Sequence, residues 1–154
     1  MTKYAQATTV SSEKSRAEIE STLRRYGATS FMYGTTADRA IVAFEANARR
    51  IKFDLPMPDP KAREFMYTPA VRKHRSPAQQ EQAYEQAVRQ KWRALALCIK
   101  AKLEAVDAGI TTFESEFLAH IVLPNGCTVA ESALPAIADA YNGKSMPPLL
   151  GYSP

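Results

Sequence analysis

The feature of this sequence that most constrains its fold is a long amphipathic helix, which the residue pattern predicts over residues 77–108. Large apolar residues recur along this segment at steps of three and four, so they share one face of an α-helix. They are Tyr84, Val88, Trp92, Leu95, Ile99, Leu103 and Val106. The helix start is predicted from Ser76 as the cap, Pro77 in the first turn and Gln79 as the capping-box partner of the serine. A face this large has to be buried, and we expect it to cover a sheet.

A second series on the same helix consists of small residues and lies roughly opposite the apolar face. Its members are Ala87, Ala94, Cys98, Ala101 and Ala105. Small side chains allow another helix to approach this face closely.

Three β-strands are predicted before the long helix, over residues 29–33, 40–44 and 49–55. The first two are rich in aromatic and β-branched residues, and a turn at 34–38 separates them. In the third, Ile51, Phe53 and Leu55 alternate with polar residues, which is the pattern of a half-buried antiparallel strand. Three closely spaced prolines then end the strand, because proline lacks the N–H that a sheet ladder needs.

Two further segments flank the strands. Ser15 and Glu18 fit a capping box and predict a helix over about 15–26. Residues 56–76 combine three prolines with the basic run at 72–75, which predicts a mobile basic loop.

The C-terminal third is predicted to be mainly helical. Thr111 and Glu114 form a capping box for a short amphipathic helix. The Asn-Gly pair at 125–126 favours a tight hairpin within residues 121–129. A further capping box at Thr128 begins the last helix, over about 129–141.

Together these patterns predict a single α+β domain spanning residues 1–154. A small antiparallel sheet of about three strands is covered by the long helix, and a helical, acidic C-terminal section with a short hairpin packs against it. Residues 144–154 form an extended apolar tail, which either docks on the body or contacts a partner.

The charges are divided unevenly along the chain. Residues 39–102 contain 14 Lys and Arg against 6 Asp and Glu, whereas residues 103–154 contain one Lys against six acids. A concentrated positive field attracts polyanions such as nucleic acid. The acidic segment can cover that field or meet the basic surface of another copy, so we also expect a homo-oligomer.

Several classes of protein are disfavoured by what the sequence lacks. No stretch approaches the roughly 20 apolar residues of a membrane span, and the N-terminus has no secretory signal pattern. We therefore expect a cytoplasmic protein without a membrane partner. Cys98 and Cys127 have no second cysteine at metal spacing, which favours reduced, buried thiols, no metal and no cofactor.

Catalytic groups are also sparse, and we expect a non-enzymatic protein with no catalytic residues. His120 lies between apolar neighbours and is interpreted as a packed structural histidine, while His74 lies in the basic loop. Glu114 and Glu116 point about 200° apart on a helix, so they do not converge on a metal ion.

The basic residues are the candidate functional feature. Phosphates bind such cations largely without regard to base, and the binding weakens as salt rises. The candidate nucleic-acid-binding residues are Arg50, Lys52, Tyr67, Arg72, Lys73, Arg75, Arg89, Arg93 and Lys100. Tyr67 is the preferred aromatic for stacking on bases, since Trp92 belongs to the apolar face and is expected in the core. The alternative is a solvated surface with an incidental excess of charge.

Several segments resemble a family of small proteins of unassigned function that bacteriophages and prophages encode. They are Tyr26–Thr29, Arg49–Pro56, the stretch from Lys91–Leu97 through Ile121–Gly126, and Met146–Leu150. The resemblance covers most of the chain but implies no functional residues. A phage setting implies a role in DNA replication, recombination or counter-defence.

The predicted order of a helix, three antiparallel strands and a long helix is also similar to the core of single-strand annealing proteins. This likeness implies oligomers that hold single-stranded DNA in a basic groove, where Arg50 and Lys52 would match in placement. Double-stranded-RNA-binding modules share the order, but their lysine-containing motif is absent at Ser76–Glu81.

The sequence thus predicts a phage-encoded nucleic-acid-binding protein, favouring single-stranded DNA, in recombination or replication. Two alternatives remain open. One is a protein-interaction module or counter-defence inhibitor that binds a host protein. The other is a protein that sequesters anionic nucleotides with the same cations.

Overall fold

The structure is a computed structural model that describes residues 5–70, 72–143 and 145–150. Its elements, in chain order, are α1 (Ser12–Arg25), β1 (Ser30–Thr35), β2 (Arg39–Ala46), β3 (Arg49–Pro56), α2 (Arg63–Met66), α3 (Pro77–Asp107), α4 (Phe113–Phe117), the 3-10 helix η1 (Leu118–His120) and α5 (Val129–Tyr141). The predicted α+β fold is confirmed. Three parts of the predicted segments lie outside the described residues. They are Lys144 and residues 151–154 of the predicted tail, and Val71 of the predicted loop.

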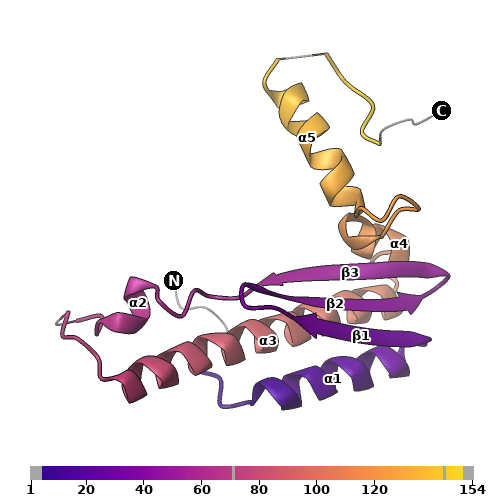
Figure 1. Cartoon of the computed structure of the whole chain (residues 1–154). Helices are drawn as coiled ribbons and strands as arrows, with labels where there is room; N and C mark the ends of the chain where they lie inside the picture. Colours follow the sequence, from indigo (N-terminus) through magenta and orange to yellow (C-terminus); the bar gives the residue numbers. More distant parts are fainter. Residues whose placement is uncertain (1–4, 71, 144, 151–154) are drawn as a thin grey trace.

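The strands form one antiparallel sheet in the order β1-β2-β3, with α1 and α3 on one of its faces (Figure 1). The core lies between these layers. It includes Val42, Phe44, Ile51 and Phe53 from the sheet, Ile19 and Leu23 from α1, and Trp92, Leu95, Ile99 and Leu103 from α3. Trp92 is only 1% exposed, which confirms its place in the core.

The predicted long helix is confirmed as α3, including its start. The side chain of Ser76 accepts a hydrogen bond from Gln79 N, and the side chain of Gln79 accepts one from Ser76 N, so the capping box is complete. The apolar face of α3 covers the sheet, as the period of three and four requires.

The small-residue series on α3 does not pack against a helix. Ala94, Cys98 and Ala101 are exposed, and α1 lies on a different flank of α3. That flank is marked by the ion pair between Arg93 and Glu18. Helix α1 therefore does not use the close approach that these small side chains allow.

Both cysteines are free and exposed, so the prediction of buried thiols was also wrong. Cys98 belongs to the exposed small series on α3. Cys127 lies in the turn after Gly126, where its N–H donates to the side chain of Asn125 at 3.0 Å. The prediction relied on the apolar neighbours of each cysteine in the sequence. Such neighbours do not ensure burial, because Cys98 lies on an uncovered side of α3 and Cys127 lies in an exposed turn.

Helix α1 begins one turn earlier than predicted. The side chain of Ser11, not Ser15, accepts the capping hydrogen bond, from Lys14 N at 3.1 Å. Ser15 is fully buried, and its hydroxyl has no hydrogen-bond partner among the described residues. The sequence favoured Ser15 because Glu18 completes its capping-box pattern, but Glu18 pairs with Arg93 instead.

The turn between β2 and β3 places two consecutive non-glycine residues in the left-handed region. Asn47 has φ 50° and Ala48 has φ 57°. This two-residue geometry suits the twist of a hairpin, but an alanine Cβ is strained there. The conformation of Ala48 therefore raises the energy of the folded state locally, and the pairing of β2 with β3 holds the residue in it.

The C-terminal third is helical as predicted, although only part of it packs against the body. Thr112 caps α4, where Thr111 was predicted, and Phe113 and Phe117 reach the core. The turn before α5 is also present, with a bridge between Val122 and Thr128. Its backbone extends the sheet edge, since Val122 N donates to Arg50 O at 2.8 Å.

Helix α5 starts at the predicted capping box, but it projects away from the sheet (Figure 1). Its main contact with the body is η1. The prediction that the whole C-terminal section packs against the sheet is therefore wrong for α5. Only Ala133 of this helix is buried; Leu134 and Tyr141 are exposed, and the other large apolar residues are half-buried.

Alanine substitutions of Ser11, which caps α1, and of Ser15, within α1, should change the free energy of unfolding in opposite directions. Replacing Ser11 with alanine removes the cap and should destabilise the protein by about 1 kcal/mol. Ser15→Ala removes a buried hydroxyl without a partner and should stabilise it by about 1 kcal/mol. Urea unfolding followed by circular dichroism measures both; destabilisation by Ser15→Ala would contradict the structural assignment.

Ala48→Gly should stabilise the protein by about 1 kcal/mol, because glycine removes the Cβ strain of the left-handed conformation. The matched control is Ala101→Gly in the exposed middle of α3, which should destabilise by about 1 kcal/mol. Thermal and urea unfolding of both variants give the comparison. Equal destabilisation by both would show that Ala48 carries no strain.

Candidate nucleic-acid interface

The structure distributes the nine predicted binding residues over three surfaces. Arg50 and Lys52 lie on the open face of the sheet, because they alternate with the buried Ile51 and Phe53 of β3. Arg93 lies in the helical layer that covers the opposite face. The remaining residues divide between α3 and the segment before it, so the nine do not form one continuous tract.

On the open sheet face, both predicted cations are already paired with carboxylates. Arg50 lies 3.2 Å from Glu45, and Lys52 lies 3.7 Å from Glu131 at the start of α5. These pairs are substantially exposed, so each adds little stability, but they reduce the positive field of this face.

The helix cations are partly neutralised in the same way. Arg93 pairs with Glu18 of α1, and Arg89 lies 3.7 Å from Glu85 one turn away. Lys100 is exposed and forms no ion pair among the described residues. Of the three, only Lys100 remains available as a free surface cation.

The acidic C-terminal third supplies several of the neutralising carboxylates. Besides the Lys52 pair, Glu114 lies 2.7 Å from Arg49, and Glu116 lies 3.1 Å from Lys102. Glu114 and Glu116 thus have different cationic partners and do not converge. No cluster of potential metal ligands occurs within the described residues.

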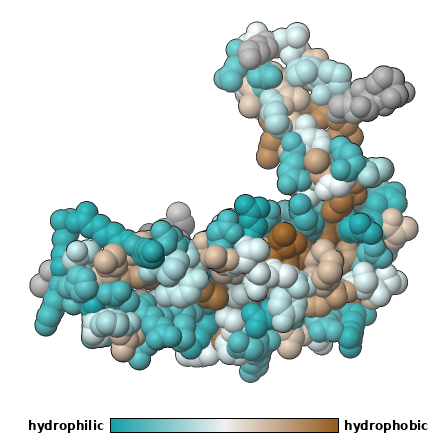
Figure 2. Space-filling view, in the orientation of Figure 1, coloured by the Kyte–Doolittle hydropathy of each residue, from teal (hydrophilic) through white to brown (hydrophobic). Residues whose placement is uncertain are grey.

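Cations without an ion pair gather in the segment between β3 and α3. We call residues 61–75 together with Lys91 the basic lobe; Val71 within it lies outside the described residues. Its Lys and Arg are Lys61, Arg63, Arg72, Lys73, Arg75 and Lys91, and none forms an ion pair within the described chain. The other such cations, Lys14, Arg25 and Lys100, are spread over α1 and α3. Figure 2 shows this end of the molecule, beside α2, as largely hydrophilic.

The basic lobe has local structure that positions its cations. Tyr67 and His74 form an isolated antiparallel bridge, and Arg75 N donates to Met66 O at 2.8 Å. Phe65 is buried and meets the ring of Tyr84 edge-on, with ring centroids 5.8 Å apart. This contact anchors the lobe to α3.

Tyr67 is half-buried within the lobe. Its ring meets His74 edge-on at 5.3 Å, and the guanidinium of Arg63 lies 5.7 Å from the ring centre. The ring is therefore held beside one cation, Arg63, within the basic lobe, and an aromatic ring near cations is a setting suited to base stacking.

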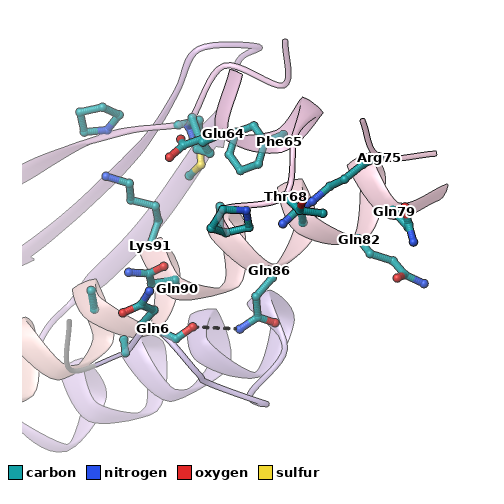
Figure 3. A pocket seen from close by; sticks show the side chains of 18 of the residues that line it. Gln6, Glu64, Phe65, Thr68, Arg75, Gln79, Gln82, Gln86, Gln90 and Lys91 are labelled. Atoms are coloured by element: carbon teal, nitrogen blue, oxygen red, sulfur yellow. Dashed lines mark hydrogen bonds between the residues drawn. The ribbon is translucent and has the colours of Figure 1, made fainter. Parts of the chain in front are cut away.

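A groove of about 1450 Å³ runs between the basic lobe and the N-terminal two-thirds of α3 (Figure 3). Its apolar lining includes Met57, Phe65, Ala87, Ala94 and Leu97. Arg75, Lys91 and Glu64 supply its charged groups.

A row of glutamines along α3 forms one side of the groove, as Figure 3 shows. The row consists of Gln79, Gln82, Gln86 and Gln90. Gln86 is held by its Nε2, which donates to the carbonyl of Thr8 at 2.8 Å. Amides can donate and accept hydrogen bonds on base edges. Sequence reasoning missed this row, although its spacing of three, four and four could have identified it.

His120 has a structural role, as predicted. Its ring is half-buried and stacks on Phe53, with ring centroids 4.0 Å apart. Burial lowers the pKa of His120 below its ordinary value, and the charge of Lys102 acts in the same direction. A backbone hydrogen bond at Lys52 opposes this shift.

No protein-family model, curated protein or solved structure matches this chain. The resemblance to phage-encoded proteins and the likeness to annealing proteins therefore stay predictions. Among the described residues, no helix has both the length and the apolar character needed to cross a membrane.

The lowered pKa of His120 predicts a pH dependence of stability. The unfolded chain takes up a proton near pH 6.5, the ordinary value, more readily than the folded protein does. Stability should therefore fall as the pH drops from 6.5 through the folded-state pKa. Urea unfolding across this range should show a shallower decline for His120→Gln, and an unchanged decline would refute the role of His120.

Proposed function

We propose that this protein is a non-enzymatic nucleic-acid-binding protein that holds single-stranded DNA in the groove beside the basic lobe. The observation that carries the proposal is the coincidence of two features at one end of the molecule. Cations without ion pairs gather there, and two of them, Arg75 and Lys91, line a groove with an apolar floor. Elsewhere the predicted binding cations are mostly paired with carboxylates.

The groove and the basic lobe beside it have chemical counterparts in a single strand. Arg75 in the groove, with Arg72 and Lys73 exposed on the adjoining lobe, can contact phosphates, which supplies affinity with little dependence on base. The apolar floor, and Tyr67 on the lobe, can contact base faces, and the glutamine row can contact base edges. A duplex keeps its base faces stacked inside the helix, so this lining favours a single strand. The resemblance to phage-encoded proteins adds recombination or replication as the setting.

The direct test is fluorescence anisotropy of a labelled single strand of about 30 nucleotides, with a matched duplex as comparison. We expect salt-sensitive binding that favours the single strand. Absence of binding at low salt would refute the proposal. Equal binding of both forms would refute the preference for a single strand.

Sequestration of small anionic nucleotides is the second candidate, because the groove combines an apolar lining with the two cations Arg75 and Lys91. Competition separates the two ideas. A mononucleotide that displaces the long strand at comparable concentration would favour sequestration. Affinity that rises with strand length would favour nucleic-acid binding.

Two charge-matched double variants locate the binding surface. Arg72→Gln with Lys73→Gln should weaken single-strand binding about tenfold and reduce the salt slope by about 1.4. Arg50→Gln with Lys52→Gln removes the same charge from the open sheet face and should weaken binding less than about threefold. Anisotropy titrations at several salt concentrations measure both effects. A larger loss in the sheet variant would place the site on β3 instead.

A further inference from the structure

The basic lobe is attached to the body of the protein by little buried surface. Among the described residues between Phe53 and Trp92, Phe65 is the only one that is buried, with 5% of its surface exposed. The other described residues of the lobe are half-buried or exposed. Because burial of apolar surface is the main force that holds packed elements together, the attachment of the lobe depends largely on this one side chain.

The contacts of the lobe with α3 are an aromatic pair and a hydrogen bond. The ring of Phe65, on α2, meets the ring of Tyr84, on α3, with the ring planes at 87°. This edge-on arrangement is one of the preferred geometries of aromatic pairs. On the polar side, Nε2 of Gln80 donates to the carbonyl of Arg75 at 2.9 Å. Together these contacts fix α2 and the basic run against α3.

Hydrogen bonds inside the lobe connect its cations to the end of α2. Thr68 N donates to Lys73 O at 2.9 Å, and Lys73 N donates to Thr68 Oγ1 at 3.0 Å. Arg75 N donates to the carbonyl of Met66, the last residue of α2. Because these bonds tie residues 72–75 to α2, the position of the cations follows the position of that helix.

We propose that Phe65 is a positioning residue: by docking the basic lobe on α3, it holds the cations of the lobe beside the groove. Phe65 carries no charge, so it acts on phosphates only through the lobe. Phe65 also lines the groove (Figure 3), where it can touch a base directly, whereas its partner Tyr84 does not line the groove. The role in strand binding rests on the proposed function; the docking of the lobe does not.

A lobe that is no longer docked keeps its charges but loses their placement. The net charge of the protein stays the same, so an anionic strand is still attracted over long distances. Binding must then order the lobe, and this ordering cost weakens the complex. The expected signature of lost positioning is therefore faster dissociation with a nearly unchanged association rate. Removal of cations should instead lower the association rate.

Limited digestion with trypsin tests the docking without any nucleic acid. Trypsin cleaves after Lys and Arg, which the lobe carries at the exposed positions 72 and 73. Cleavage requires local opening of the chain, so Phe65→Ala should be cut within the lobe about tenfold faster than the wild type. An unchanged rate of cleavage within the lobe would overturn the proposal.

The matched control is Phe113→Ala, which removes another buried ring at the opposite end of α3. This variant should leave both cleavage within the lobe and strand binding unchanged. Trp92, the single tryptophan of the chain, lies in the core, so its fluorescence during urea unfolding shows whether each variant keeps a folded core. Equal acceleration of lobe cleavage in Phe65→Ala and Phe113→Ala would overturn a specific role of Phe65.

Substitutions of Tyr84 separate positioning from direct contact with a base. Tyr84→Ala removes the ring on which Phe65 docks and should weaken binding of the labelled single strand about tenfold, mainly through faster dissociation. Tyr84→Phe keeps the ring and should bind like the wild type. Position 84 is half-buried on α3 and alanine favours a helix, so Tyr84→Ala tests the docking even where Phe65→Ala does not fold. Unchanged strand binding in Tyr84→Ala would overturn the positioning role.

A double-variant cycle tests whether the contact acts through the cations of the lobe. Added to Arg72→Gln with Lys73→Gln, Tyr84→Ala should weaken strand binding by less than a further factor of about three, because the cations that it places are already absent. Losses that multiply to about a hundredfold would show independent effects and would overturn the proposal.

Failure of this proposal and failure of the proposed function give different results. A wild type that binds no strand refutes the proposed function and with it the positioning role, while digestion still decides whether Phe65 docks the lobe. A wild type that binds the strand, with equal cleavage of the wild type and Phe65→Ala, refutes the docking and leaves the proposed function standing.

Discussion

Burial of one face of α3 against the sheet is the interaction on which the rest of the structure depends. Trp92, Ile99 and Leu103 of α3 belong to one buried core with Phe44 of β2 and Ile51 of β3, and Trp92 also meets the ring of Tyr33 of β1 edge-on. A three-stranded sheet alone has too little buried surface to persist, so the helix and sheet stabilise each other. Because α3 is straight and long, it extends past the sheet at its N-terminal end. The basic lobe packs on that extension through Phe65.

The same helix explains why a groove exists. One side of α3 is occupied by the sheet and a flank by α1, whereas Ala94, Cys98 and Ala101 of its small-residue series are exposed. The basic lobe lies beside this side of α3 and forms one wall of the groove. Ala87 and Ala94 form part of the groove floor, beside the glutamines of α3. The groove is thus a product of helix length, small side chains and one anchoring aromatic contact.

Local patterns predicted the elements well, because helix caps and strand alternation depend on neighbours in sequence. The capping box at Ser76, the alternation in β3 and the start of α5 are examples. The choice between Ser11 and Ser15 failed because Glu18 is used by Arg93, a residue 75 positions away. The prediction that the basic residues form one tract failed for the same reason. Which cations are neutralised depends on contacts such as Lys52 with Glu131, which no local pattern contains.

Charge segregation along the sequence has a different meaning once the chain is folded. The acidic C-terminal third meets the basic middle at Arg49, Lys52 and Lys102, where β3 and the end of α3 lie beside α4 and the start of α5. Those contacts neutralise the half of the molecule nearest the C-terminus. The basic lobe lies at the other end of α3, beyond the reach of these acids, and keeps its positive field. An excess that looks moderate over 64 residues of sequence is therefore concentrated at one end of the fold. Since screened fields act over about 10 Å, an anionic partner would be attracted to that end rather than to the molecule as a whole.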